Sequence, residues 1–139
     1  MERTPRQKAM KAVDTNILLR YVLRDDEDQF ARAAAFFGTR TAQDPAFVSL
    51  VVLAEFAWAL RQRYRFHRTA IRSLVETLME AAEIVLEDET ILATVVAEAE
   101  RGDLADHLIA YSARRAGCSA TVTFDAEAAR RVPSLELLS

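Results

Sequence analysis

PAFVSLVVLAEFAWAL, residues 45–60, joins a predicted strand to a predicted helix. Its first four residues suit a short strand, and Ser49 then stands as a typical helix N-cap. The rest is too long for a typical strand and too short to span a membrane, so it predicts a helix that is apolar nearly all round and largely buried. Glu55 is its only charged residue. Burial of that carboxylate is costly, so a basic partner, a proton or a metal ion must compensate it.

Short strands and helices alternate on both sides of this stretch. Predicted strands cover residues 11–14, 45–48, 83–86, 119–124 and 135–138, and predicted helices cover residues 16–24, 26–38, 49–60, 67–82, 89–101, 104–116 and 126–131. In the helix at 104–116, we expect Leu108, Ile109 and Ala113 to face inward and Gly117 to stop the helix. The order predicts an α/β fold, with a central, mainly parallel sheet of about five strands flanked by helices.

The bulk properties limit the class of protein. Residues 10–139 are expected to form one domain, and residues 1–9 a disordered extension, with Met10 as an alternative start. No signal peptide or apolar run of the roughly 20 residues that a membrane helix needs is present, which predicts a soluble, cytoplasmic protein. The net charge of −3 means that nucleic-acid binding would need a local basic patch or a metal. A single cysteine excludes an intrachain disulfide framework.

Acidic residues stand where an α/β sheet builds its site, beyond the carboxyl ends of strands. Asp14 follows the first predicted strand and Asp125 the fourth, while Asp103 and Asp106 lie on one face at the start of a helix. If these residues converge with Glu55, the like charges require a cation. Oxygen ligands favour Mg²⁺ or Mn²⁺. A carboxylate-held divalent ion is the equipment of phosphodiester hydrolysis.

The same acids also have structural interpretations. Those that precede or begin helices could be N-caps or first-turn residues favoured by the helix dipole, and for Asp103 we prefer the capping role. Capping cannot explain Glu55 in the middle of a helix. Its alternative is an internal ion pair with Arg20 or Arg114. The acids are therefore persuasive as a set and not one by one.

Three segments together resemble a PIN-domain ribonuclease: VDTNILLRYV, SLVVLAEFAWAL and GDLADHLIAYSARRAGCSATVTFDAEAAR. Within that family they are most similar to the VapC-like toxins of bacterial toxin–antitoxin pairs, from about Met10 to the C-terminus. The resemblance implies a PIN-like fold and an endoribonuclease that depends on Mg²⁺ or Mn²⁺. In that mechanism water attacks the phosphodiester, and no covalent enzyme intermediate forms.

The resemblance also implies which residues and partners take part. The family's four acids fall on Asp14, Glu55, Asp106 and Asp125. Asp14 and Asp106 are the expected metal ligands, while the other two complete the cluster and position water. Hydroxyls of Thr15 and Thr123 are expected to support the ligands. The implied partners are an RNA substrate, a cognate antitoxin that covers the acidic site, and a second copy in a homodimer.

Residues 61–68, RQRYRFHR, interleave arginines with Tyr64 and Phe66. Such a segment can grip phosphates and stack on bases, but a solvated helix end would look the same. The arginine pairs at 114–115 and 130–131 could line the rim of the site. Apolar helix faces could accept partners, although such stripes are more often core; they are carried by Phe30, Phe36, Phe37, Ile71, Leu74 and Leu78.

Other functions are weaker matches. A receiver-type phosphoacceptor module needs a lysine near the last strand, but the only lysines are Lys8 and Lys11. A haloacid-dehalogenase-like phosphatase needs an acid two residues after Asp14, where Asn16 stands. A non-catalytic PIN-like interaction module remains the alternative. Within the nuclease hypothesis, transfer, ribosomal and messenger RNA all stay open as substrates, with structure-specific DNA cleavage as a minor alternative.

Overall fold

A computed structural model describes residues 10–138, and the extension expected at residues 1–9 lies outside the described part. The order of elements is β1 (Lys11–Ala12), α2 (Thr15–Leu23), α3 (Glu27–Gly38), β2 (Ala46–Val48), α4 (Leu50–Gln62), α5 (Arg68–Glu80), β3 (Ile84–Leu86), α6 (Glu89–Glu98), α7 (Leu104–Arg115), β4 (Thr121–Thr123), α8 (Ala126–Arg131) and β5 (Leu135–Leu137). Every predicted strand and helix is present, and the predicted α/β class is confirmed.

Local signals set where the helices begin and end. The side chains of Asp26, Ser49 and His67 accept hydrogen bonds from backbone N–H groups in the first turns of α3, α4 and α5. These contacts satisfy donors that a helix start leaves without partners. Gly117 follows α7 with a φ of +94°, a backbone conformation that suits glycine. The predicted boundaries are therefore close to the observed ones.

The five strands form two separate hydrogen-bonded groups, and every strand pair within them is parallel. The first has the order β1-β2-β3, in which Ala46 of β2 lies opposite Lys11 of β1 and Ile84 of β3. The second group pairs β4 with β5, with Thr121 opposite Leu135. Within residues 10–138, β1 and β4 each have a strand partner on one edge only. The expected number of strands and their parallel pairing are present, but the strands do not form a single hydrogen-bonded sheet.

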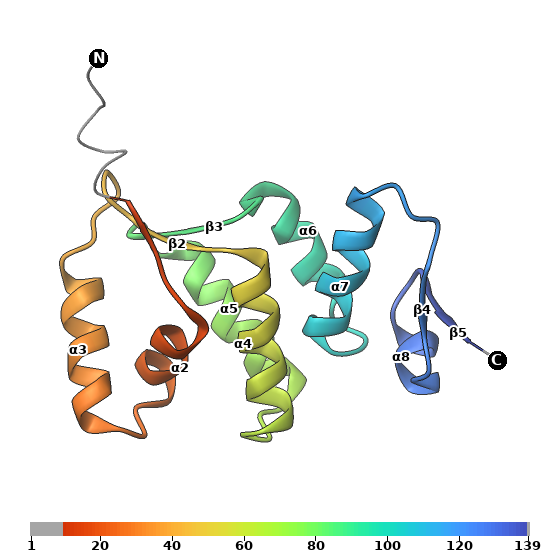
Figure 1. Ribbon diagram of the computed structural model, residues 1–139, viewed down its shortest axis with the longest axis horizontal. Helices are drawn as coiled ribbons and strands as arrows, with labels where there is room; N and C mark the ends of the chain where they lie inside the picture. The colour runs from red at the N-terminus through yellow and green to blue at the C-terminus, as the bar shows by residue number, and fades with distance from the viewer. Residues whose placement is uncertain (1–9, 139) are drawn as a thin grey trace, which may run out of the picture.

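The main core lies between the β1-β2-β3 sheet and the helices from α2 to α7. Its members are apolar side chains of these elements, and no described residue after Tyr111 belongs to the cluster. In the C-terminal segment, Ala128 and Val132 are buried locally, at 7% and 2% exposure. Figure 1 shows β4, α8 and β5 together at one end of the molecule, beyond α7. The C-terminal segment, β4–α8–β5, therefore packs largely outside the main core.

Helix α4 is not apolar and buried all round, which corrects the prediction for Glu55. The side chain of Glu55 is exposed, and Val51 and Trp58 on the same face are 71% and 52% exposed. The opposite face packs into the core through Leu53, Phe56, Ala57 and Leu60. Neighbouring helices cover one face of α4, and the uncovered face carries apolar residues that the sequence pattern could not distinguish from core. Glu55 therefore does not carry the cost of full burial.

A second correction concerns α7, in which Ile109 is 51% exposed instead of buried. The inward face is formed by Leu104, Leu108 and Tyr111, which recur at helical spacing and turn Ile109 toward solvent. Of the helix stripes considered as partner surfaces, Phe37 and Ile71 belong to the core cluster. Among the described residues, no helix has the length and apolar character needed to cross a membrane.

Candidate active site: two groups of acidic residues

The first acidic group joins the start of α2 to the middle of α4. Asp14 is the N-cap of α2, and its Oδ1 accepts a hydrogen bond from Thr15 N at 2.8 Å. The Thr15 hydroxyl donates in turn to Glu55 Oε1 at 2.6 Å. The second oxygen of each carboxylate has no hydrogen-bond partner among residues 10–138. One threonine thus positions two of the expected acids and leaves an oxygen of each available to a ligand.

The internal ion pair considered for Glu55 does not form. Arg20 Nη1 binds Asp25 Oδ1 at 2.9 Å, and Arg114 Nη1 donates to Ser134 Oγ at 3.1 Å. Within the described part of the chain, Glu55 has no cationic partner. Its charge is therefore left for solvent or a ligand to compensate.

The same acids open into a pocket of about 290 Å³. Asp14, Thr15 and Glu55 form one part of its wall, and Trp58 and Arg63 of the α4 end form another. The pocket therefore combines two carboxylates, a half-exposed indole ring and a guanidinium group.

The second acidic group lies where α7 and α8 begin. Asp106 is half-buried in the first turn of α7. Burial raises the pKa of Asp106, and the nearby charges of Asp103 and Asp125 raise it further. Asp125 caps α8, with its Oδ1 accepting from Ala128 N at 3.0 Å. The hydroxyl of Thr123 accepts from Asp125 N at 3.0 Å, so it contacts the backbone of that acid and not its carboxylate.

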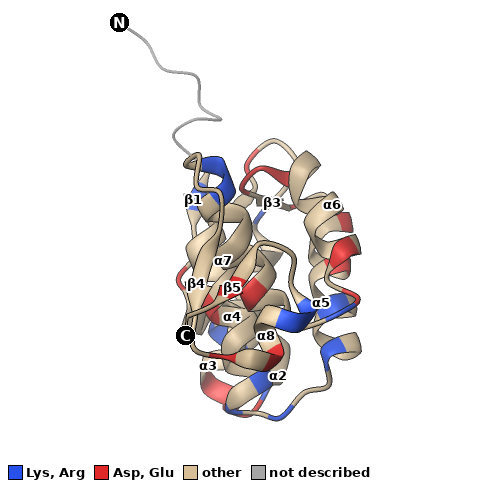
Figure 2. Cartoon of the chain, turned by 90° about the vertical axis from the view of Figure 1, so that its right-hand side faces the viewer, with Lys and Arg blue, Asp and Glu red and all other residues tan. Residues whose placement is uncertain are grey.

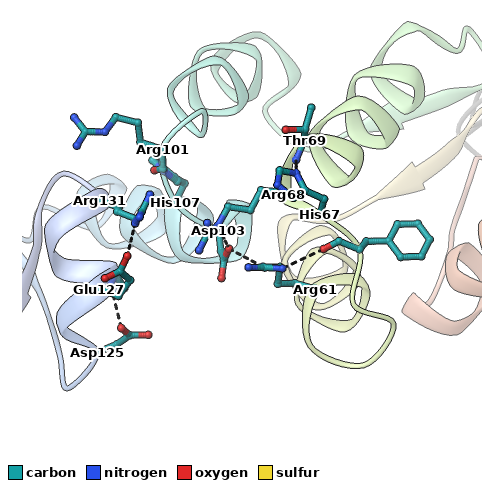
Figure 3. Close-up of polar contacts among 12 residues, drawn as sticks. Arg61, His67, Arg68, Thr69, Arg101, Asp103, His107, Asp125, Glu127 and Arg131 are labelled. Carbon is teal, nitrogen blue, oxygen red and sulfur yellow. Dashed lines mark hydrogen bonds and ion pairs between the residues drawn. The ribbon is translucent and has the colours of Figure 1, made fainter.

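Asp103 has a different role from the one preferred on sequence grounds. It occupies the N-cap position of α7, but its side chain makes no capping hydrogen bond. Its Oδ1 instead lies 3.1 Å from Arg61 Nε and 2.5 Å from Arg68 Nε (Figure 3). These arginines belong to α4 and α5, so one carboxylate ties three helices together. The charge of Asp103 is compensated by cations, whereas that of Asp106 meets two further acids.

A glycine allows α8 to pack closely against the loop before α7. Gly102 has a φ of +104°, and a Cβ there would lie 3.0 Å from Val132 Cγ2. The buried His107 of α7 makes a hydrogen bond of 2.7 Å between its Nε2 and the carbonyl of Arg101 in this loop (Figure 3). The close approach of Val132 to Gly102 places the C-terminal segment beside the loop that leads into the first turn of α7, which carries Asp106.

The structure brings the four expected acids together as two pairs. Helices α4 and α7 lie between α2 and the C-terminal segment (Figure 1), and residues 10–138 contain no set of three or more potential ligands close enough to share a metal ion. Mg²⁺ is commonly bound through one or two carboxylates while it keeps several waters. The oxygen donors of each pair fit that chemistry. A cation near Asp106 would also offset the repulsion that raises its pKa.

The arginines of residues 61–68 have different partners and surroundings. Arg61 and Arg68 bind Asp103, Arg63 lies at the pocket beside Glu55, and Arg65 is exposed. Figure 2 shows basic and acidic residues interspersed on the side that it presents, in line with the net charge of −3. RNA binding would therefore depend on individual arginines placed near the acids.

The sequence pattern predicts no role for Trp58 at the site and marks Arg63 only as one cation in a basic run. A signal for Trp58 was present: it is the only tryptophan and follows Glu55 by three residues, which places both on one helix face. The exposure of that face was the missing information.

The family model described as PIN domain matches residues 11–134, a range that includes both acidic groups. A search of curated proteins finds no match to the chain.

Proposed function

The chain belongs to the PIN-domain family, and from that premise we propose that it is a metal-dependent endoribonuclease that hydrolyses phosphodiester bonds in structured RNA. PIN domains are usually nucleases. The observation that carries the proposal is the link from Asp14 through Thr15 to Glu55, which places two of the four expected acids at one pocket. We assign the activity to a domain of residues 10–139.

The proposed catalytic residues are Asp14, Glu55, Asp106 and Asp125. Asp14 and Asp106 are the proposed metal ligands, with Mg²⁺ as the ion and Mn²⁺ as a substitute. When bound, the ion supplies an activated water and neutralises charge on the leaving oxygen. The N-cap hydrogen bonds orient Asp14 and Asp125, and the Thr15 hydroxyl orients Glu55. These fixed carboxylates direct the water and the phosphate without being consumed in the reaction.

Asp106 contributes through its unfavourable surroundings. Because burial and the neighbouring acids raise its pKa, the metal-free chain keeps a proton on this carboxyl to a higher pH than on an ordinary aspartate. A carboxylate in such surroundings gains more from a nearby cation than a freely solvated one does. Binding of a cation near Asp106 should therefore favour ionisation of Asp106, and ionisation of Asp106 should favour binding of the cation.

Within the family, we propose the role of toxin in a toxin–antitoxin pair. The support is the similarity of VDTNILLRYV, SLVVLAEFAWAL and the segment from Gly102 to Arg130 to VapC-like toxins. The proposed partners are a cognate antitoxin that covers the acidic site and a second copy of the chain in a homodimer. The proposed location is the cytoplasm.

RNA cleavage by the purified chain tests the activity. Total small structured RNA is incubated with Mg²⁺, with Mn²⁺ or with EDTA, beside the Asp14→Asn and Asp28→Asn variants. Asparagine keeps the N-cap of α2 but removes the charge, so Asp14→Asn should fold and lose cleavage. Asp28 is an exposed acid of α3, paired with Arg32, and its variant should cleave normally. Metal-dependent products that vanish in Asp14→Asn alone are the expected result.

The alternative is a non-catalytic PIN-like interaction module. The observation that favours it is the separation of the acids into two pairs in the described structure. Absence of cleavage by the folded chain, together with no Mg²⁺ binding in a calorimetric titration, would establish this alternative.

For the toxin role, expression of the chain should arrest growth, and expression of Asp14→Asn should not.

A further inference from the structure

Trp58 places an aromatic ring in solvent next to the acidic pocket. It is 52% exposed and lies one turn after Glu55 on the uncovered face of α4. Val51, on the same face, is 71% exposed but does not line the pocket. A single exposed apolar residue is ordinary on a protein surface. Trp58 is distinctive because its ring shares a pocket with two acids expected at the catalytic site.

Arg63 supplies a cation in the same pocket. Its side chain is exposed, and no ion pair or hydrogen bond engages its guanidinium within residues 10–138. Arg61 and Arg68, in contrast, are both bound to Asp103. Of the arginines in this segment, Arg63 is thus the one that borders Trp58 and keeps all its donors for a ligand.

The indole face, the guanidinium and the two carboxylates of this pocket each interact differently with the base and the phosphate of a nucleotide. The ring offers a stacking surface to a base, and the guanidinium donates to phosphate oxygens. Asp14 and Glu55 repel the anionic backbone unless a cation intervenes, which favours placing the phosphate toward Arg63. A bound nucleotide would therefore lie with its base on Trp58 and its phosphate toward the arginine.

We propose that Trp58 stacks on an unpaired RNA base and that Arg63 contacts the phosphate next to it. A base inside a duplex has both faces covered by its neighbours, so this surface selects nucleotides in single strands, loops or bulges. The inference rests on the proposed function and specifies its substrate: the strand is cleaved beside an unpaired nucleotide. Trp58 acts by binding and orienting the substrate, and takes no part in proton transfer.

Intrinsic fluorescence tests the contact directly, because Trp58 is the only tryptophan of the chain. The wild-type protein in EDTA is titrated with a short single-stranded RNA and, separately, with the same sequence as a duplex. Single-stranded RNA should quench Trp58 emission in a saturable way, and the duplex should leave it nearly unchanged. EDTA prevents metal-dependent cleavage, so this measurement reports binding alone.

Variants then measure how much the ring contributes. With fluorescently labelled single-stranded RNA, Trp58→Ala should bind about 5- to 100-fold more weakly, in the range measured for loss of one stacked base. Trp58→Phe should recover most of the affinity because it keeps an aromatic face. Val51→Ala, which removes an exposed apolar side chain from the same helix face, should bind like wild type. Affinity falls as salt rises, and Arg63→Gln should make the slope of log affinity against log salt shallower by about one. Arg72→Gln on α5 should leave that slope unchanged.

The outcomes separate this inference from the proposed function. If Trp58→Ala binds as well as Val51→Ala, or if the duplex quenches as strongly as the single strand, stacking is overturned even where metal-dependent cleavage persists. Selective quenching without cleavage under any metal condition would uphold stacking and refute the nuclease. Trp58 emission that ignores RNA but changes with protein concentration would place the ring in a protein interface and also overturn the inference.

Discussion

The two acidic groups differ in their exposure and in the contacts that position them. Asp14 and Glu55 are exposed, and a neutral hydroxyl, that of Thr15, joins them. At the other group, Asp106 is half-buried between two further acids, and Asp103 is bound by a pair of arginines. The first group is solvated and open to a ligand, whereas the second concentrates charge in a partly dehydrated place.

The surroundings of the second group oppose ionisation of Asp106. Water screens the charges of Asp14 and Glu55. Their side chains are positioned by the hydroxyl of Thr15 and by the N-cap hydrogen bond of α2. At the second group, burial raises the pKa of Asp106 while Arg61 and Arg68 compensate the adjacent Asp103. A cation should therefore alter the protonation of Asp106, and variants of the two groups should behave differently in stability even where they behave alike in catalysis.

The largest effect is expected when one acid of each group is neutralised. Asp14→Asn and Asp106→Asn should each reduce RNA cleavage by about 100-fold or more, because losing a proposed metal ligand should cost at least as much as the roughly 10- to 100-fold lost with a residue that only supports a ligand. If both groups serve one reaction, the double variant should be no worse than either single variant, because residues that act as a unit are not additive. The measurement is the cleavage rate of all four proteins. Multiplied losses would mean that the groups serve separate steps.

A smaller but still large effect is expected on stability where the loop before α7 meets the C-terminal segment. Gly102→Ala forces an L residue into a φ of +104° and brings its Cβ to 3.0 Å from Val132 Cγ2. We expect a loss of about 1 to 3 kcal/mol in the free energy of unfolding. Gly38→Ala is the control, because a Cβ there meets nothing within 4 Å. Urea denaturation measures both, and equal stability of the two variants would contradict the role of Gly102.

The next effect distinguishes Asp103 from its neighbour Asp106. Asp103→Asn should destabilise the fold by about 1 to 2 kcal/mol, because it removes the charge that holds Arg61 and Arg68 in a partly exposed site. It should spare most of the cleavage activity. The control is Asp28→Asn, whose exposed pair with Arg32 contributes about 0.3 to 0.5 kcal/mol. Loss of cleavage without loss of stability would instead make Asp103 a ligand.

The smallest effect is a pH dependence at Asp106. Its pKa in the folded state is raised above the ordinary value of 3.8, so below that value folded and unfolded chains are both protonated and Asp106→Asn should match wild type. As pH rises through the folded-state pKa, wild type must ionise a half-buried carboxyl and loses stability relative to the variant. Thermal unfolding in EDTA between acid and neutral pH should show this divergence.

A control variant and the addition of Mg²⁺ complete the measurement of this pH dependence. Glu98→Gln, at an exposed position of α6, serves as the control for removing one surface carboxylate. Added Mg²⁺ should narrow the difference between wild type and Asp106→Asn, because a cation stabilises the ionised form. A wild type that gains stability over the variant as pH rises in EDTA would contradict the raised pKa.

Much of the fold was predictable because its signals are local. Ser49 and Asp26 start helices by bonding to backbone groups three residues ahead, and Gly117 ends one, so each boundary is encoded within one turn. The division of the sheet was not predictable in this way. It depends on which strand each edge meets, and β4 carries no local mark that would pair it with β5 alone.

The candidate site was predictable in its residues but not in their surroundings. The positions of Asp14 and Asp125 after strands follow from chain order. The exposure of Glu55 does not, because an apolar run gives no sign that one face of α4 remains uncovered. The arginines on Asp103 come from two other helices, about 35 and 42 residues away in sequence, and no pattern near Asp103 announces them.

The C-terminal segment has a consequence for local opening of the fold. Because β4, α8 and β5 add no residue to the main core, releasing them exposes little apolar surface beyond Ala128 and Val132. The free energy of that opening should lie below that of global unfolding, so amide protons of the β4–β5 ladder should exchange with solvent before those of β2. Asp125 is therefore carried by a less cooperative part of the molecule than Asp14. A ligand that bridges Asp125 to Asp106 would reveal itself as slower amide exchange in this segment.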